Sequence, residues 1–106
     1  MKDTLATLVA LIKTRRSAKA DTSYTRQLLD QGPKRCAKKF GEEAVEAVIA
    51  ATAQTSEELT SEAADVVYHL LVMLESRDVA WADVLAKLEG RMGTSGIAEK
   101  ASRTAS

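Results

Sequence analysis

Acidic side chains gather in two short segments near the middle of the chain. The first contains Glu42, Glu43 and Glu46, and the second contains Glu62 and Asp65. On a helix, which turns by about 100° per residue, the three glutamates of the first segment fall within an arc of about 100°. Like charges three or four residues apart on a helix repel each other by about 0.2–0.5 kcal/mol. An acidic face of this kind favours a compensating cation.

The types of the side chains indicate which cation. Carboxylate oxygens are the ligands that Mg²⁺ and Mn²⁺ prefer, whereas zinc prefers cysteine and histidine, of which the chain has one each. We therefore predict Mg²⁺ as the cofactor, with Mn²⁺ as the alternative. Such an ion can neutralise a di- or triphosphate and activate a water molecule. Lys38 and Lys39, about one turn before the acids, can meet phosphate oxygens as point charges.

The plainer interpretation is that these acids only make a solvated helix face. Surface helices are rich in glutamate, and the spacing of Glu42, Glu43 and Glu46 alone does not separate the two interpretations. The second acidic segment favours a site, because the predicted fold places it opposite the first.

The two acidic segments lie on two long predicted helices. The first begins at Pro33, where the missing N–H of a first helical residue costs nothing, and runs to about Ala53. The second begins after Thr55, which forms a capping box with Glu58, and runs to about Arg77. Because the connecting turn is very short, the helices must form an antiparallel hairpin. The hairpin brings the two acidic segments level, so five carboxylates are predicted to converge across one groove.

Each long helix also carries an apolar stripe, which is the side that a helix normally buries. On the first helix, Lys39 falls within the acidic arc and the apolar stripe lies on the far side. That stripe consists of Phe40, Ala44, Val48 and Ala51. The apolar stripe of the second helix consists of Leu59, Ala63, Val66, Leu70 and Leu74. A polar stripe, about 130° further round the second helix, consists of Glu58, Glu62, Asp65 and His69.

Shorter helices are predicted on either side of the hairpin. A first helix begins at Asp3 or Thr4, either of which can cap it. A brief helix begins near Ser23 and is stopped by Gly32. A last helix contains Trp81, which we expect to anchor the bundle. From residue 90 the composition shifts to glycine, serine, threonine and charge, so we expect one helical domain over residues 1–90 and a loosely held tail over residues 91–106.

The composition predicts an all-α protein, a small helical bundle. The 106 residues include one proline and five glycines, and aromatic residues make up only 4% of the chain. Fifteen basic and fifteen acidic side chains cancel, so no global field attracts nucleic acid or a membrane surface.

The sequence also predicts a cytoplasmic location. The single cysteine, Cys36, excludes an intrachain disulfide and suits a reducing compartment, where we expect it to act as a small packing residue. No apolar run approaches the roughly 20 residues of a membrane span. Residues 1–11 lack the basic start and the cleavage site of a signal peptide.

The acidic segments resemble a known pattern. Glu42-Glu43-x-x-Glu46, fifteen residues and then Glu62-x-x-Asp65 are similar to the EExxE…ExxD pattern of the all-α nucleoside triphosphate pyrophosphatases, the MazG-like superfamily. Within it, the chain resembles the phosphoribosyl-ATP pyrophosphatase family over roughly residues 5–103. A departure is Phe40, where that family commonly has an aliphatic residue. The further matching segments are Ser23-Tyr24-Thr25, Lys39-Phe40-Gly41-Glu42-Glu43, Ala64-Asp65-Val66-Val67-Tyr68-His69-Leu70-Leu71, Arg91, and Ser95-Gly96-x-x-Glu99-Lys100-x-x-Arg103.

The resemblance implies hydrolysis of phosphoribosyl-ATP between the α- and β-phosphates, in the second step of histidine biosynthesis. It also implies dependence on Mg²⁺ and a homodimer whose helices complete the bundle. The implied metal ligands are Glu42, Glu43, Glu46, Glu62 and Asp65. Our candidate catalytic residues are Glu43, Glu46 and Lys39. Our candidate substrate-binding residues are Lys38, Lys39, Ser23, Tyr24, His69, Arg91, Lys100 and Arg103.

Several of these residues have plainer alternatives. His69, one turn after Asp65, either meets substrate or is a partly buried histidine satisfied by Asp65, and we favour the second. Tyr68 is expected to pack. Ser23 fits an ordinary helix start as well as a substrate loop. The tail either closes over phosphates or is a frayed terminus.

Two other functions compete with the implied one. A house-cleaning pyrophosphatase for non-standard nucleoside triphosphates would need the same acidic groove, so only its substrate preference would differ. A non-enzymatic helical dimerisation module would use the glutamate and lysine stripes for solubility and pairing alone.

Overall fold

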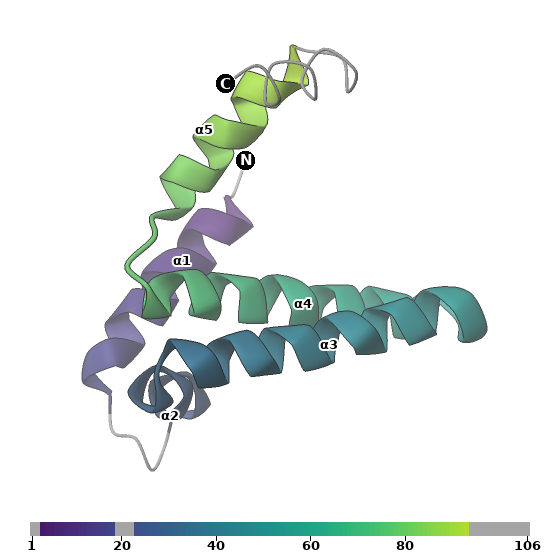
Figure 1. Cartoon of the computed structure of the whole chain (residues 1–106), viewed down its shortest axis with the longest axis horizontal. Coiled ribbons are helices and arrows are strands. Elements are labelled where there is room, and N and C mark those ends of the chain that lie inside the picture. The colour runs from purple at the N-terminus through teal and green to yellow at the C-terminus, as the bar shows by residue number, and fades with distance from the viewer. Residues whose placement is uncertain (1–2, 19–22, 94–106) are drawn as a thin grey trace.

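A computed structural model of the chain describes residues 3–18 and 23–93. Within these residues the regular structure is entirely helical, which confirms the all-α prediction (Figure 1). Helix boundaries follow the sequence signals closely, because caps and turns are local features. The elements are α1 (Thr4–Thr14), the 3-10 turn η1 (Arg15–Ser17), α2 (Tyr24–Gln31), α3 (Pro33–Ala53), α4 (Ser56–Ser76) and α5 (Trp81–Met92).

Three of the predicted helix caps are confirmed. The side chain of Asp3 accepts a hydrogen bond from the backbone N–H of Ala6 at 3.0 Å and caps α1. Ser23 caps α2 in the same way, and Thr55 caps α4 by accepting from the N–H of Glu58 at 3.1 Å. The carboxylate of Glu58 accepts a hydrogen bond from the Thr55 hydroxyl, whereas the predicted capping box has it reach back to the cap's backbone N–H.

A single residue turns the chain between α2 and α3. Gly32 has a φ of 88°, in the left-handed region that glycine adopts at little cost, and Pro33 follows it as the first residue of α3. This abrupt change of direction lets α2 pack against the start of α3 and against α4. The N-terminus of α2 is thereby brought beside the hairpin.

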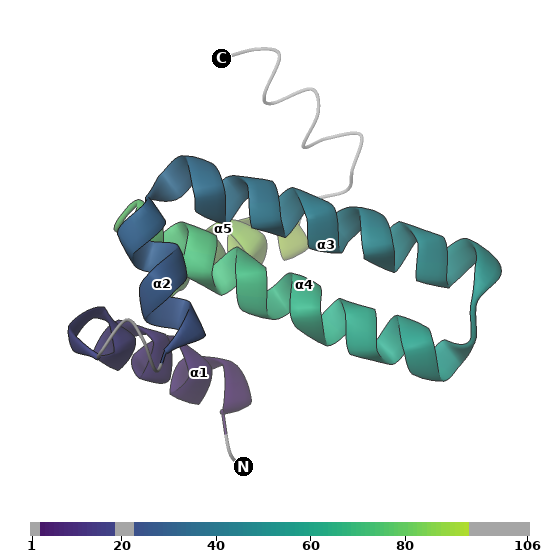
Figure 2. The ribbon, with the colours of Figure 1, turned by 90° about the horizontal axis from the view of Figure 1, so that it is seen from below.

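Helices α3 and α4, with 21 residues each, are the longest helices in the described part of the chain, and they form the predicted hairpin. The two helices lie side by side along their length and are joined at Gln54 and Thr55 (Figures 1 and 2). Helices α1 and α2 cover only the end of the hairpin that is far from this turn, and α5 projects away from it. The other half of the hairpin therefore lacks covering helices from the described part of the chain.

The hydrophobic core lies where α1, α2, the start of α3 and the end of α4 meet. Trp81 packs against this core, as predicted for a bundle anchor. Cys36 is buried within it, and its thiol donates a hydrogen bond to the carbonyl of Leu28 at 3.2 Å. Burial raises the pKa of the thiol, so its reactive thiolate form is disfavoured and the packing role is confirmed. The core residues are Ile12, Leu28, Cys36, Leu71 and Val72.

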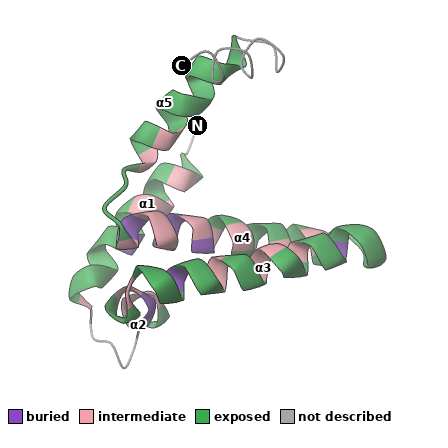
Figure 3. Ribbon diagram, in the orientation of Figure 1, coloured by how far each residue is buried: buried purple, intermediate pink, exposed green. Residues whose placement is uncertain are grey.

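The predicted apolar stripe of α3 is wrong in its second half. Val48 is 62% exposed and Ala51 is also exposed, whereas the buried residues of α3 are Cys36 and Ala50. These two lie seven residues on either side of Glu43, so the acidic face is the face that packs against α4. The sequence pattern misled because, among the described helices, it is chiefly α4 that packs against α3 near the turn, so much of that half of α3 stays exposed (Figure 3).

The stripe predicted for α4 needs a smaller correction. Ala63 is exposed, and Leu59, Val66 and the later stripe residues are half-buried. The fully buried apolar residues are Leu71 and Val72, outside the stripe. The end of α4 contacts α1 and α2 as well as α3, so it is buried on more sides than an amphipathic stripe implies.

An ion-pair network around the nearly buried Glu75, which the sequence pattern did not predict, joins α1 and η1 to the end of α4. The carboxylate of Glu75 is only 9% exposed and receives Lys13 Nζ at 3.1 Å and Arg16 Nε at 2.7 Å. Arg16 also donates to the backbone carbonyl of Glu75 and to Asp78. The network fixes the position at which the chain leaves α1 and approaches α2.

None of the helices in residues 3–18 and 23–93 is both long enough and apolar enough to cross a membrane.

Candidate metal centre

Charged residues on α3 and α4 continue the coiled-coil spacing of the buried residues Cys36 and Ala50 on α3 and His69 and Val72 on α4. Residues spaced alternately by three and four form the seam between two packed helices and are normally apolar. In this hairpin most of the seam positions are charged or polar, and only Cys36, Ala50 and Val72 are apolar. The seam residues of α3 are Cys36, Lys39, Glu43, Glu46 and Ala50, and those of α4 are Glu58, Glu62, Asp65, His69 and Val72.

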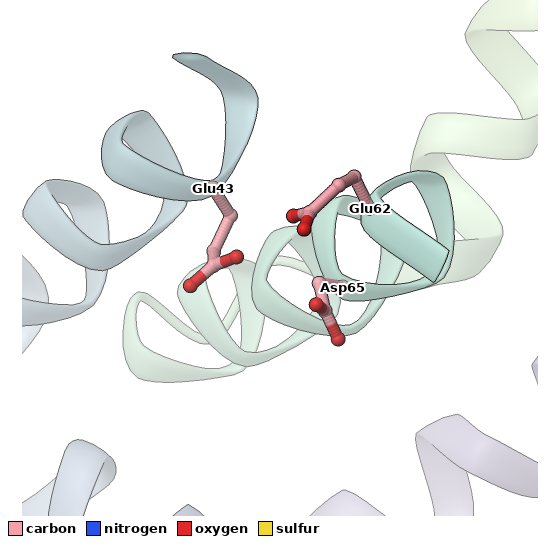
Figure 4. Close-up of side chains that lie close together, drawn as sticks. All are labelled: Glu43, Glu62 and Asp65. Carbon is pink, nitrogen blue, oxygen red and sulfur yellow. The ribbon is translucent and has the colours of Figure 1, made fainter. Parts of the chain in front are cut away.

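Three carboxylates converge within this seam. Glu43 on α3 and Glu62 and Asp65 on α4 each offer an oxygen, and these three oxygens lie within 4.8 Å of one another (Figure 4). Glu43 and Glu62 are half-buried, while Asp65 is exposed. The hairpin thus brings together three of the five predicted metal ligands, and all the donors in the cluster are carboxylate oxygens. This donor set fits a hard divalent cation.

The electrostatics of the cluster are unfavourable without a cation. Partial burial raises the pKa of Glu62, and the nearby carboxylates of Glu46, Asp65, Glu43 and Glu58 raise it further. Both causes disfavour the ionised form. A bound cation would reverse the electrostatic part of this effect.

Glu42 and Glu46 are placed differently from the converging three. Glu42 is half-exposed, pairs with Lys39 and lies outside the cluster. Glu46 also lies outside it but is close enough to affect the pKa of Glu62. Both glutamates line a shallow depression on α3 together with Lys39, Glu43 and Val45.

Lys39 already has acidic partners. Its ammonium lies 3.8 Å from Glu42 and 3.7 Å from Glu43, and the side chain is 24% exposed. The lysine therefore neutralises part of the acidic face from within α3. Lys38, its neighbour, is exposed on the helix surface.

His69 extends the seam beyond Asp65 and is buried. Its Nδ1 lies 2.8 Å from the backbone carbonyl of Asp65, and its Nε2 lies 3.3 Å from the hydroxyl of Tyr24. The histidine is therefore satisfied by Asp65, as favoured, but through the backbone and not through the carboxylate.

The start of α2 forms a small aromatic cluster with α4. The ring of Tyr24 stacks against that of Tyr68, with centroids 6.4 Å apart, and both rings meet His69 edge-on. The Tyr68 hydroxyl forms a hydrogen bond with Thr25, and burial raises the pKa of Tyr68, although this hydrogen bond opposes the shift. Sequence reasoning gave Tyr68 a packing role and missed its contact with Thr25.

The remaining predicted substrate-binding residues lie at the start of α2, in α5 or outside the described residues. Ser23 is buried, and its hydroxyl accepts a hydrogen bond from the Arg26 backbone N–H, so it serves the cap of α2. Arg91 was expected in the tail but lies in the last turn of α5. Lys100 and Arg103 lie outside the described residues.

Comparisons with known proteins identify the family. The sequence profile of phosphoribosyl-ATP pyrophosphohydrolases matches residues 5–92. The chain belongs to this family. The resemblance drawn from the acidic and aromatic motifs is thereby confirmed.

Individual relatives of this family cover almost the whole chain. A phosphoribosyl-ATP pyrophosphatase from Dinoroseobacter shibae is 63% identical over 93% of this chain and 97% of its own length. One from Cereibacter sphaeroides is 59% identical over 93% of this chain and 96% of its own. One from Ruegeria pomeroyi is 57% identical over 91% of both.

Proposed function

We propose that this chain hydrolyses phosphoribosyl-ATP between its α- and β-phosphates in the second step of histidine biosynthesis. Water adds across the anhydride bond, and the products are phosphoribosyl-AMP and pyrophosphate. The observation that carries the proposal is the convergence of Glu43, Glu62 and Asp65 in a chain of the phosphoribosyl-ATP pyrophosphohydrolase family. The names of the three relatives support the substrate.

The acidic cluster is the proposed site of Mg²⁺, with Mn²⁺ as the alternative. Glu43, Glu62 and Asp65 would hold the ion, since their oxygens already converge. When bound, the ion supplies charge neutralisation for phosphate oxygens and acidifies water. Glu42 and Glu46 complete the predicted ligand set from the adjoining depression.

The chain's own residues would share the remaining work. Glu46, one turn beyond Glu43 and close to Glu62, is the candidate acceptor for the proton of the attacking water. Lys39 would exchange its contacts with Glu42 and Glu43 for phosphate oxygens when substrate arrives. Lys38 and Arg91 are candidates for outer phosphate contacts, and so are Lys100 and Arg103 of the tail.

We further propose that two copies pair through the uncovered half of the hairpin. Val45, Val48 and Ile49 on α3 are between 47% and 62% exposed, and Val67 on α4 is 37% exposed. At helical spacing Val45, Val48 and Ile49 share one face of α3, and an exposed apolar face favours an interface. Pairing two hairpins there would complete a four-helix bundle and cover the region that is mostly exposed in Figure 3.

A cytoplasmic location is supported by the free thiol of Cys36.

Pyrophosphate release tests the proposed activity. With Mg²⁺ present, the full chain should release pyrophosphate and phosphoribosyl-AMP in equal amounts from phosphoribosyl-ATP. Release from ordinary dNTPs should be slower by about 100-fold or more, because a site that hydrogen-bonds specific substrate groups rejects analogues that lack them. Equal rates would favour the house-cleaning pyrophosphatase. The absence of release from any triphosphate would favour the dimerisation module.

A further inference from the structure

In the aromatic cluster at the start of α2, the neighbouring groups determine which partner donates in the hydrogen bond between Tyr24 and His69. The backbone carbonyl of Asp65 can only accept, so Nδ1 of His69, 2.8 Å away, must carry a proton. In a neutral imidazole with its proton on Nδ1, Nε2 has only a lone pair. The hydroxyl of Tyr24, 3.3 Å from Nε2, therefore donates its proton to the histidine.

This direction decides what Tyr24 can offer to a ligand. With its proton held by His69, the phenol oxygen presents lone pairs and acts as an acceptor. The side chain is 49% exposed, so a ligand can reach it. Phosphate oxygens are acceptors too and would gain nothing from this oxygen, whereas a hydroxyl or an amino group would donate to it.

The position of the cluster relative to the acids is also defined. His69 follows Asp65 by four residues on α4, which is about one helical turn or 5–6 Å along the axis. Tyr24 is held beside His69, and its ring is supported by that of Tyr68. A nucleotide whose phosphates lie at the carboxylates would place its next group, the sugar and base, within reach of Tyr24.

We propose that Tyr24 binds the nucleoside part of the substrate by accepting a hydrogen bond from one of its hydroxyl or amino groups, and that His69 is the positioning residue that fixes this polarity. The proposal rests on the proposed nucleotide substrate and adds a specificity-determining residue to it. The ring of Tyr68 stacks on the ring of Tyr24, and the Tyr68 hydroxyl is hydrogen-bonded to Thr25.

Two test ligands distinguish binding of the nucleoside from binding of the phosphates. AMP carries the nucleoside and one phosphate, and inorganic triphosphate carries phosphates alone. With Mg²⁺ present, Tyr24→Phe should weaken AMP binding about five- to tenfold, which is the value of one net hydrogen bond. The affinity for inorganic triphosphate should stay within about twofold. Calorimetry on the full chain measures both affinities directly.

Matched variants test the role of His69 and control for structure. Tyr68→Phe makes the same chemical change on the neighbouring, half-buried ring and should leave the ratio of the two affinities unchanged. His69→Gln places its amide near the position of Nε2, where its oxygen can accept from Tyr24, and should retain AMP binding better than His69→Asn, whose shorter amide reaches only the position of Nδ1. Circular dichroism checks that each variant is folded.

The outcomes are distinct. The proposal is overturned if Tyr24→Phe weakens both ligands equally, because Tyr24 would then act on the phosphates, or if it weakens neither. It is also overturned if His69→Asn binds AMP as the wild type does. A wild type that releases no pyrophosphate from phosphoribosyl-ATP would remove the proposed activity, while the comparison of AMP with triphosphate would still decide the role of Tyr24.

Discussion

At the scale of single residues, Glu43 links the packing of α3 on α4 to the proposed metal site. It sits midway between the buried residues Cys36 and Ala50 on the face of α3 that packs against α4. A carboxylate at a seam position costs stability unless a partner compensates its charge. Lys39 supplies part of that compensation at 3.7 Å, and the proposed cation supplies the rest.

The first prediction concerns Mg²⁺ and Glu43. Saturating Mg²⁺ should raise the melting temperature of the wild type by about 5 °C or more, because a ligand that binds only the native state stabilises it. Glu43→Gln should melt higher than the wild type in EDTA, since repulsion is removed, and should lose most of the response to Mg²⁺. The matched control is Glu89→Gln, on an exposed side chain of α5 outside the cluster and outside the predicted ligand set. If both variants keep the full response, Glu43 holds no cation.

The second prediction concerns pH and Glu62. Its pKa is raised in the folded protein, so the native state binds this proton more tightly than the unfolded state does. Stability of the metal-free protein should therefore fall as pH rises from the ordinary glutamate value, about 4.3, through the raised folded value. Thermal melts in EDTA between pH 5 and pH 7.5 measure this slope. Glu62→Gln should flatten it, and Glu89→Gln on exposed α5 should not.

At the scale of elements, caps and turns account for the success of the sequence predictions. Gly32 and Thr55 fix where α3 and α4 begin, because their effects act on neighbouring backbone groups. The rotation of each helix about its axis is not local. It depends on which other helices cover it, and for that reason the buried face of α3 was predicted on the wrong side while its ends were predicted correctly.

The third prediction concerns the network that attaches α1 to α4. Glu75→Gln removes a nearly buried carboxylate that pairs with Lys13 and Arg16, and it should lower the free energy of unfolding by about 2 kcal/mol. The partners are half-exposed, so the loss is smaller than for a fully buried pair. Asp78→Asn, on an 81% exposed side chain of the same network, should cost under about 0.5 kcal/mol. Urea denaturation monitored by circular dichroism compares the two, and equal losses would contradict the prediction.

At the scale of the whole molecule, the hairpin extends beyond the helices that cover it. The core occupies one end, where α1, α2, the start of α3 and the end of α4 meet, and the acidic cluster lies further along α3 and α4 towards the turn. Since the exposed apolar residues of α3 lie on the half nearer the turn, the proposed dimer and the proposed metal site depend on the same two helices. Disturbing the pairing should therefore also weaken the site.

The fourth prediction tests this assembly. Val48→Lys places a charge in the middle of the exposed apolar stripe of α3 and should convert the protein from dimer to monomer at micromolar concentration, because an unpaired charge is costly to bury in an interface. Analytical ultracentrifugation gives the mass in solution. Met92→Lys, on the exposed end of α5, makes a comparable change elsewhere and should stay dimeric. A wild type that sediments as a monomer would remove the proposed dimer.

The sequence alone determined the helices, the hairpin and the family, because helical periodicity, capping and motif spacing are properties of neighbouring residues. It also placed the two acidic segments opposite each other, since a short turn leaves two helices no other arrangement. The tertiary structure decided which carboxylates meet. Glu43, Glu62 and Asp65 converge, while Glu42 and Glu46 lie beside them, because the packing of α3 on α4 fixes the rotation of both helices. The same packing set the hydrogen bonds of His69 and so the polarity of Tyr24, which no local pattern encodes.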